Sequence, residues 1–180
     1  MKKHSFIQVD FHPSVKLTNA EEAKISKWLG MASLTLEQLI REKKLIHPSW
    51  LKNTTSLRVS VLLCGEDKIR KLNRDYRNKD KVTDVLSFPH FPNLRKLKTQ
   101  DDFTGTVLLL GDLAICHQRA IKQAKEFKVS YWDEFIHLFI HGTIHLLGYD
   151  HELSVKEEKL MEDWENQALT LFSKIKKKGP

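Results

Sequence analysis

The segment FIHGTIHLLGYDHEL, residues 139–153, constrains this chain more than any other. His141 and His145 are four residues apart, so on a helix both imidazoles project from one face on adjacent turns. Gly148 comes where a helix commonly ends in a left-handed residue, after which the chain can reverse and bring His151 against the same face. Three imidazoles so placed make a catalytic type of zinc site. The sequence therefore predicts a metal centre held by His141, His145 and His151 at the end of a central helix.

A fourth histidine, His137, precedes His141 by one helical turn and is a poorer ligand. A rise of ~1.5 Å per residue places the α-carbons of His137 and His145 roughly 12 Å apart along the helix axis. With metal–nitrogen bonds of ~2.0–2.1 Å, the ligand nitrogens of one ion lie within about 4 Å of each other. We therefore expect His137 to be a core residue or to support a ligand.

Gly142 separates this pattern from the zinc proteases. The histidine spacings equal those of the H-E-x-x-H-x-x-G-x-x-H motif, but glycine replaces the glutamate. In the proteases that glutamate accepts a proton from water and passes it to the leaving amine. A phosphodiester depends less on this group, since a metal activates water and polarises a phosphoryl oxygen, and a cationic side chain stabilises the developing charge. The pattern favours phosphodiester cleavage over proteolysis.

Charge and composition agree with a nucleic-acid substrate. Lysine and arginine number 30 against 23 acidic residues, a formal net charge of +7 that favours polyanionic partners. No apolar run approaches the ~20 residues that span a bilayer, and the N-terminus has no sustained apolar segment of a signal peptide. We expect a cytoplasmic location and no membrane partner. Cys64 and Cys116, far apart in sequence, are expected to be buried thiols.

Apolar periodicity predicts one α+β domain over residues 1–180, in which a small mixed sheet packs with about five helices. Strands are predicted at 6–11, 57–63 and 84–88, and at 106–110 and 112–116 as two strands or as one bulged strand around Gly111. Helices are predicted at 20–43, where Gly30 leaves open one helix, a bent helix or two helices, and at 66–76, 117–127, 130–147 and 154–175. Residues 43–55 and 90–103 are predicted connections, the second either padding or a lip over a binding site. We expect 173–180 to be a frayed basic tail.

Three blocks resemble the YbeY family, the bacterial rRNA maturation factors. HGTIHLLGYDH at 141–151 resembles the family signature H-G-x-x-H-L-x-G-Y-D-H, and LNRDYRNKDKVTDVLSFP at 72–89 is similar to its L-N-x-x-Y-R-x-K-D-x-P-T-D-V-L-S-F-P block. LGDLAIC at 110–116 is similar to its L-G-D-I-x-I segment. These blocks place the resemblance at about residues 57–151, in matching order. Val82 stands where the family has proline, and residues 30–55 look longer than the family's connection.

The resemblance implies a single-strand-specific, metal-dependent endoribonuclease. It implies action in maturation of the small-subunit rRNA 3′ end and in ribosome quality control. The implied ligands of one Zn²⁺ per chain are His141, His145 and His151, and the implied partners are single-stranded or ribosomal RNA and the ribosome or its small subunit. DNA is not expected, and the oligomeric state is left open. The family's functionally important arginine falls on Arg77, whose planar fork suits phosphate oxygens; a solvated arginine at a helix end is the alternative.

Two other functions fit parts of the pattern: a metallopeptidase-like hydrolase with its base elsewhere, and a non-catalytic ribosome-assembly protein with structural zinc. A structural site should have four protein ligands, and no fourth is evident. The proton-transfer group is open between bound hydroxide, Asp150 acting through water, and the RNA 2′-OH. Further side chains could approach the site or simply bond loops: Asp84, Asp112, Ser87 and Thr83. Four more could form a phosphate-attracting rim or a solvated basic loop: Lys79, Arg95, Lys96 and Lys98.

Overall fold

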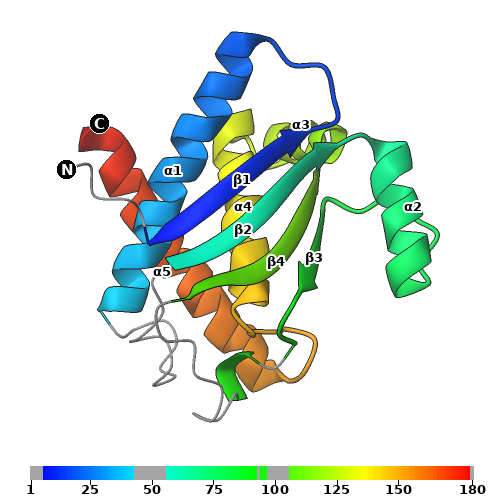
Figure 1. Cartoon of the computed structure of the whole chain (residues 1–180). Coiled ribbons are helices and arrows are strands. Elements are labelled where there is room, and N and C mark those ends of the chain that lie inside the picture. The colour runs from blue at the N-terminus through cyan, green and yellow to red at the C-terminus, as the bar shows by residue number, and fades with distance from the viewer. Residues whose placement is uncertain (1–5, 43–55, 93, 97–105, 179–180) are drawn as a thin grey trace.

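The computed structural model describes residues 6–42, 56–92, 94–96 and 106–178. Within these ranges one four-stranded mixed sheet has the order β1-β2-β4-β3. Its strands are β1 (Ile7–Pro13), β2 (Ser56–Cys64), β3 (Val85–Pro89) and β4 (Val107–Cys116). Strands β1, β2 and β4 are parallel, and β3 pairs antiparallel with β4 at the sheet edge (Figure 1).

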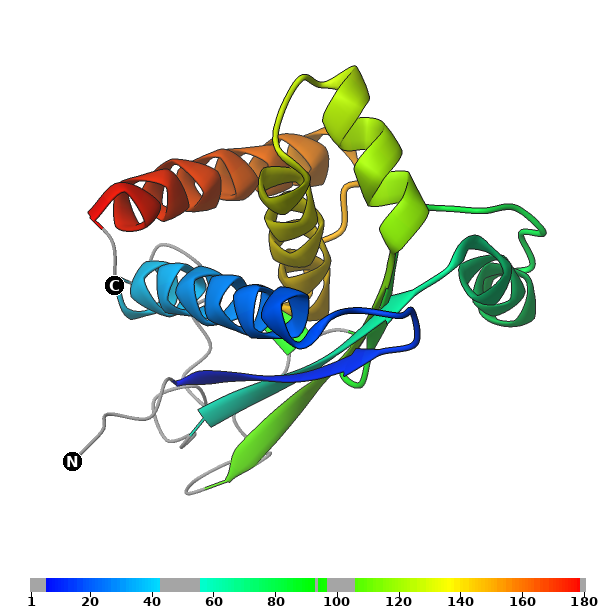
Figure 2. The same ribbon diagram turned by 90° about the horizontal axis from the view of Figure 1, so that it is seen from above.

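Five helices flank this sheet. They are α1 (Asn19–Arg41), α2 (Glu66–Arg77), α3 (His117–Glu126), α4 (Tyr131–Leu146) and α5 (Val155–Lys178), with a short 3-10 helix, η2, at Leu94–Lys96. Helices α1, α4 and α5 lie on one face of the sheet, whereas α2 stands apart from them (Figure 2). This arrangement confirms the predicted α+β class, with a small mixed sheet and five helices over the described residues.

The core has two parts because apolar side chains are buried on both faces of the sheet, in a larger cluster on one face and a smaller cluster on the other. Alternate residues of β2, such as Val59 and Val61, pack against α1, α4 and α5 in the larger cluster, with Phe135 and Phe139 of α4 fully buried. The opposite face forms a smaller cluster in which Ile69 of α2 packs on β2, β3 and β4. Each large apolar side chain buried in this way stabilises the fold by roughly 1.5–3 kcal/mol.

The helix that carries the histidines begins where the sequence predicts. The Ser130 hydroxyl accepts a hydrogen bond from the backbone N–H of Asp133 at 3.1 Å, which caps α4. Thr18 and Glu21 form a reciprocal capping box at the start of α1. Helix α1 continues through Gly30, so residues 19–41 form one helix and not two.

Several predicted boundaries differ from the structure, among them the end of β1, which lies at Pro13 and not at residue 11. The frayed tail expected from residue 173 is wrong for residues 173–178, because α5 continues to Lys178. Phe172 is buried, and the Lys176 ammonium lies 2.7 Å from an Asp133 carboxylate oxygen and 4.7 Å from the centre of a Trp28 ring. Strand β3 includes Pro89, which a sheet edge tolerates because its missing N–H is not needed there.

Strand β4 is one bulged strand, the second of the two predicted alternatives. Arg58 of β2 pairs with Leu109 and Val59 with Gly111, so Leu110 is the extra residue. Gly111 has a φ of +145°, and a β-carbon there would overlap the carbonyl oxygen of Phe88. The predicted connection at 43–55 lies outside the described residues.

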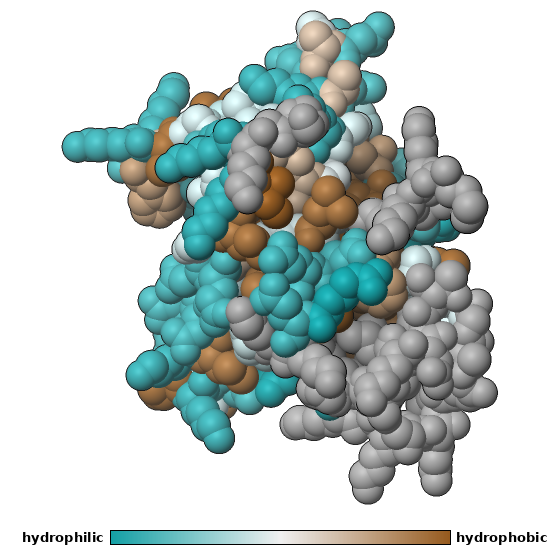
Figure 3. Space-filling model, turned by 90° about the vertical axis from the view of Figure 1, so that its left-hand side faces the viewer, coloured by the Kyte–Doolittle hydropathy of each residue, from teal (hydrophilic) through white to brown (hydrophobic). Residues whose placement is uncertain are grey.

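One lateral side of the molecule, the left-hand side of Figure 1 where α5 ends, is ordinary protein surface. Its described residues show mainly hydrophilic side chains with apolar patches between them (Figure 3). Among the helices of the described ranges, none has the length and apolar character to cross a membrane.

Candidate metal centre

Three histidines meet at the C-terminal end of α4. His141 and His145 lie on adjacent turns of the helix, and His151 comes from the turn that follows it. The ring centroids are 4.7 Å apart for His141 and His145, 4.9 Å for His145 and His151, and 5.5 Å for His141 and His151. One nitrogen of each ring lies within 4.8 Å of the other two, close to the separation of about 4 Å that ligands of one ion require. These side chains could hold a metal ion.

The turn that returns His151 is fixed by a glycine cap. Gly148 has a φ of +90°, its N–H donates to the carbonyl of His145, and the N–H of Tyr149 donates to Ile144. This pattern is a Schellman motif, which closes a helix with a left-handed residue. A β-carbon at Gly148 would lie 3.2 Å from the backbone nitrogen of Arg95, so η2 packs directly on the turn. The glycine therefore serves both the chain reversal and the close approach of η2.

Hydrogen bonds fix the orientation of the two helical imidazoles. Nδ1 of His141 is 2.7 Å from Oε1 of Glu165 on α5, and Nδ1 of His145 is 2.9 Å from the carbonyl oxygen of Tyr149. Carbonyl and carboxylate oxygens only accept, so each Nδ1 carries a hydrogen, and in the neutral imidazole Nε2 is then the nitrogen with the free lone pair. Metal-binding histidines are commonly held in this way by a carboxylate or a carbonyl. The donor set thus fits a metal that prefers neutral imidazole.

Glu165 also joins His137 to the centre. Nε2 of His137 is 3.7 Å from Oε2 of Glu165, and its Nδ1 is 3.7 Å from Oε1 of the buried Glu134. The carboxylates of Glu134 and Glu165 raise the pKa of His137 to about 9 against the opposing effect of burial. Burial favours the neutral form of Glu165, but His137 and His141 outweigh it and lower the pKa of Glu165 to about 2. His137 therefore stays outside the trio and contacts the carboxylate that orients His141.

The environment keeps His145 neutral. Burial, followed by the nearby His141 and His151, lowers the pKa of His145 to about 4. An imidazole must be unprotonated to bind a metal, so this ligand position is ready over the neutral pH range.

At Gly142, α4 lies close to the sheet, so an added side chain would meet the side chains of β3 and β4. A β-carbon there would be 2.8 Å from Cδ2 of Leu113 on β4 and 3.2 Å from Oγ of Ser87 on β3. The Ser87 hydroxyl donates to the Gly142 carbonyl at 3.3 Å. A side chain at this position would therefore require Leu113 to move, and glycine supplies no acid or base there.

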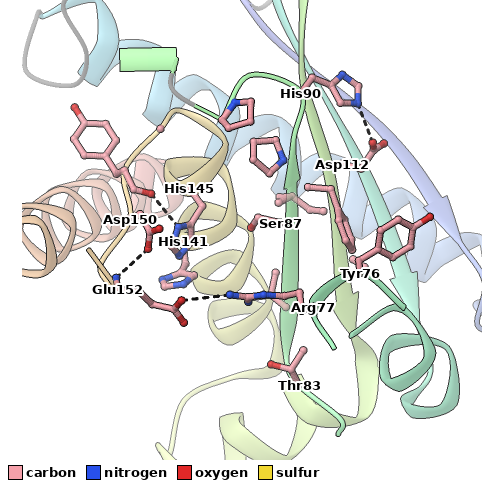
Figure 4. A pocket seen from close by; sticks show the side chains of 18 of the residues that line it. Tyr76, Arg77, Thr83, Ser87, His90, Asp112, His141, His145, Asp150 and Glu152 are labelled. Carbon is pink, nitrogen blue, oxygen red and sulfur yellow. Dashed lines mark hydrogen bonds and ion pairs between the residues drawn. The ribbon is translucent and has the colours of Figure 1, made fainter. Parts of the chain in front are cut away.

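The trio opens into a pocket of about 1650 Å³ that Arg77 also lines. Figure 4 shows Arg77 extending from the end of α2 toward Glu152, next to His151 in sequence. The distance from Nη2 of Arg77 to Oε2 of Glu152 is 3.5 Å, and the Arg77 side chain is 44% exposed. A pair this open contributes about 0–1 kcal/mol, so phosphate can compete with Glu152 for the guanidinium.

The aspartates considered as further site residues mostly form hydrogen bonds with neighbouring residues. Asp84 accepts from Gln123, Val85 and Thr83; burial raises its pKa, but these hydrogen bonds outweigh burial and lower it. Asp150 lines the pocket, and its Oδ1 accepts from the backbone N–H of Glu152. Asp112 pairs with His90 at 3.2 Å on the pocket wall.

Of the four basic residues considered for a phosphate-attracting rim, Arg95 makes structural contacts within the protein. It lies 2.6 Å from Glu157 and stacks 4.1 Å from the centre of the Tyr149 ring. Lys79 is exposed just after α2. The Lys96 backbone belongs to η2, and Lys98 lies outside the described residues. Cys64 and Cys116 are buried free thiols, as predicted.

Glu165 and Tyr76 are site residues that sequence reasoning did not identify. Glu165 follows His151 by fourteen residues on a different helix, so no local spacing connects it to the histidines. Its place among apolar residues on the inner side of an amphipathic helix was the available signal. Tyr76 lies in the last turn of α2 and is 70% exposed.

Comparison with known proteins supports the resemblance. The family model described as Endoribonuclease YbeY matches residues 17–173. Proteins named endoribonuclease YbeY are 36% identical over 160 residues in Aquifex aeolicus, covering 89% of each chain, and 35% identical over 155 residues in Thermodesulfovibrio yellowstonii, covering 86% of this chain and 90% of that one. One in Finegoldia magna is 44% identical over 117 residues, covering 65% of this chain and 70% of the other.

A solved structure shares the fold. The solution structure of TM1509 from Thermotoga maritima matches with a TM-score of 0.52 and 26% identity, and the match covers 92% of this chain and 88% of that chain. The family match includes both helices that build the histidine centre and the strand–helix block that ends in Arg77. The chain therefore belongs to the YbeY endoribonuclease family.

Proposed function

We propose that this protein is a zinc-dependent endoribonuclease that cleaves single-stranded RNA, with ribosomal RNA as its substrate in the cytoplasm. The observation that carries this proposal is one pocket shared by three convergent imidazoles and an arginine, in a chain of the YbeY family. Following the family, we assign its role to maturation of the small-subunit rRNA 3′ end and to ribosome quality control, with the ribosome or its small subunit as partner.

His141, His145 and His151 would hold one Zn²⁺, and the hydrogen bonds that His141 and His145 make through Nδ1 leave their Nε2 atoms free for it. Bound zinc supplies Lewis-acid chemistry, which activates water and polarises a phosphoryl oxygen. Within the described ranges no fourth histidine, cysteine, aspartate or glutamate joins the three. A three-ligand set is typical of catalytic zinc, whereas structural zinc has four protein ligands, so the arrangement favours the enzyme over an assembly protein with structural zinc.

The remaining site residues would bind the RNA phosphate and orient a metal ligand. Arg77 would contact the phosphate near the cleaved bond, because a guanidinium offers two parallel donors to phosphate oxygens. Glu165 would hold the His141 ring in place. Gly142 supplies no carboxylate where the zinc proteases have their glutamate, and Leu113 and Ser87 crowd this position, which disfavours the metallopeptidase alternative.

The test compares zinc content and RNA cleavage in four purified proteins: wild type, His141→Ala, Arg77→Ala and Arg74→Ala. Arg74 is the matched control, because it lies on the same helix and pairs with Asp75 outside the pocket. We expect His141→Ala to lose both zinc and cleavage, Arg77→Ala to keep zinc and lose cleavage, and Arg74→Ala to keep both. Labelled single-stranded RNA and its duplex are the substrates. Cleavage by His141→Ala at the wild-type rate would overturn the metal assignment.

A further inference from the structure

Tyr76 is the exposed aromatic side chain of the pocket that also contains the histidines. It lies in the last turn of α2, directly before Arg77, and 70% of its side chain is exposed. Its ring meets Phe88 of β3 edge-on, with 5.2 Å between centroids and 68° between ring planes. This contact holds the ring on one side, while most of its side-chain surface stays exposed.

A polar pair lies beside this aromatic pair. Phe88 on β3 is the register partner of Asp112 on β4, so their side chains are neighbours on the same sheet face. Oδ2 of Asp112 is 3.2 Å from Nε2 of His90, and both residues line the pocket. Figure 4 shows Tyr76, Asp112 and His90 grouped on the side of the pocket away from His141 and His145.

The edge strand β3 separates this group from the metal centre. Successive residues of a strand point to opposite faces, so Ser87 faces α4 and Gly142 while Phe88 faces Tyr76. A ligand that reaches both groups must therefore cross β3. Since β3 is the last strand of the sheet, its outer side offers such a path within the described structure.

The chemistry of the group suits a base better than a phosphate. The Asp112 carboxylate repels phosphate but accepts hydrogen bonds from the amino and imino groups of base edges. Aromatic rings stack on any base, and only an unpaired base is free to leave its own strand and stack there. The cationic Arg77, by contrast, extends toward the histidine side.

We propose that Tyr76, backed by Phe88 and bordered by Asp112 and His90, binds one unpaired nucleobase of the RNA strand whose phosphate lies at Arg77 and the histidines. The proposal rests on the proposed function and adds a structural reason for single-strand preference. Tyr76 stacks on the base, and the His90–Asp112 pair faces its polar edge.

The experiment measures Kd for two strands of equal length in the presence of EDTA, so that no cleavage occurs. One is a labelled oligouridylate, and the other is the same sugar–phosphate strand without bases. We expect Tyr76→Ala to raise the Kd for oligouridylate roughly 5- to 150-fold, the range found for loss of one base–aromatic stack, and to leave the Kd for the abasic strand unchanged. Tyr76→Phe should keep wild-type binding of both strands.

Two further variants separate stacking from other effects. Phe127→Ala removes an exposed aromatic side chain outside the pocket and should leave both Kd values unchanged. Arg77→Ala should weaken both strands alike, because it contacts phosphate. Equal binding by wild type and Tyr76→Ala, or equal weakening of both strands by Tyr76→Ala, would overturn the base-binding assignment. Failure of the proposed function appears separately, as zinc-loaded wild type that leaves single-stranded RNA uncleaved.

Discussion

Removal of the Glu165 carboxylate should weaken zinc binding without changing a metal ligand. Glu165 comes from α5 and accepts from Nδ1 of His141 at 2.7 Å, with its side chain only 16% exposed. This bond fixes the imidazole orientation and makes Nε2 a better donor. The variants Glu165→Gln and Glu165→Ala test it, the first because it keeps a neutral acceptor of similar shape.

The size of the effect follows from the hydrogen bond. A bond to a charged group contributes about 1.5–3 kcal/mol, and supporting residues of this kind change metal affinity by about 10- to 100-fold, or about 1.4–2.8 kcal/mol at 1.4 kcal/mol per tenfold. The two ranges agree. We therefore expect Glu165→Gln to lose about tenfold in zinc affinity and Glu165→Ala to approach 100-fold.

Zinc affinity is measured at neutral pH by competition with a chromophoric chelator, beside thermal unfolding of the zinc-free proteins. Glu162→Gln is the control, because Glu162 is exposed on the same helix. Unfolding temperatures near that of the wild type would show that lost affinity does not come from a lost fold. The reasoning fails if Glu165→Ala binds zinc as tightly as wild type while His141→Ala does not bind it.

Three other results are expected. The pKa of His137 is raised to about 9 from an ordinary 6.5, so the stability that its protonated form contributes is complete below about pH 6.5 and is lost as the pH rises through 9. The free energy of unfolding of the zinc-free protein should therefore fall over this pH window. It should fall less in His137→Gln. Gly142→Ala should destabilise the protein in urea by up to about 2 kcal/mol, since overpacking against Leu113 costs about 1–3 kcal/mol and outweighs a gain in helix propensity of at most about 1, whereas Gly30→Ala, with open space around it, should stabilise. Glu152→Gln should lower the Kd for RNA by freeing Arg77, with the unfolding temperature unchanged.

Much of the fold was predictable because its signals are local. Apolar periodicity located β2 and α4, and in the structure Ser130 caps α4 at its predicted start. The end of α5 was missed because its lysines resemble a solvated tail in sequence, and only the docking of Lys176 on Asp133 and Trp28 shows that the helix continues.

In the candidate site, too, the features that arise from local sequence were predictable. His141 and His145 meet because a helix brings every fourth residue to the same face, and Gly148 returns His151 because glycine adopts a positive φ without strain. Both effects act within eleven residues of chain, so the sequence alone determined that the three imidazoles converge.

Contacts between distant segments needed the tertiary structure. The Glu165 carboxylate beside His141, the sheet side chains that crowd Gly142, and the Tyr76–Phe88 wall all join elements that no sequence spacing relates. Their positions follow from how helices and strands dock to bury apolar surface. Because the hydrophobic effect is non-directional, an apolar segment in the sequence does not show which other segment it will pack against. The sequence determined that the three imidazoles converge. The docking of distant segments determined which residues orient them, which side chains crowd Gly142, and which residues line the rest of the pocket.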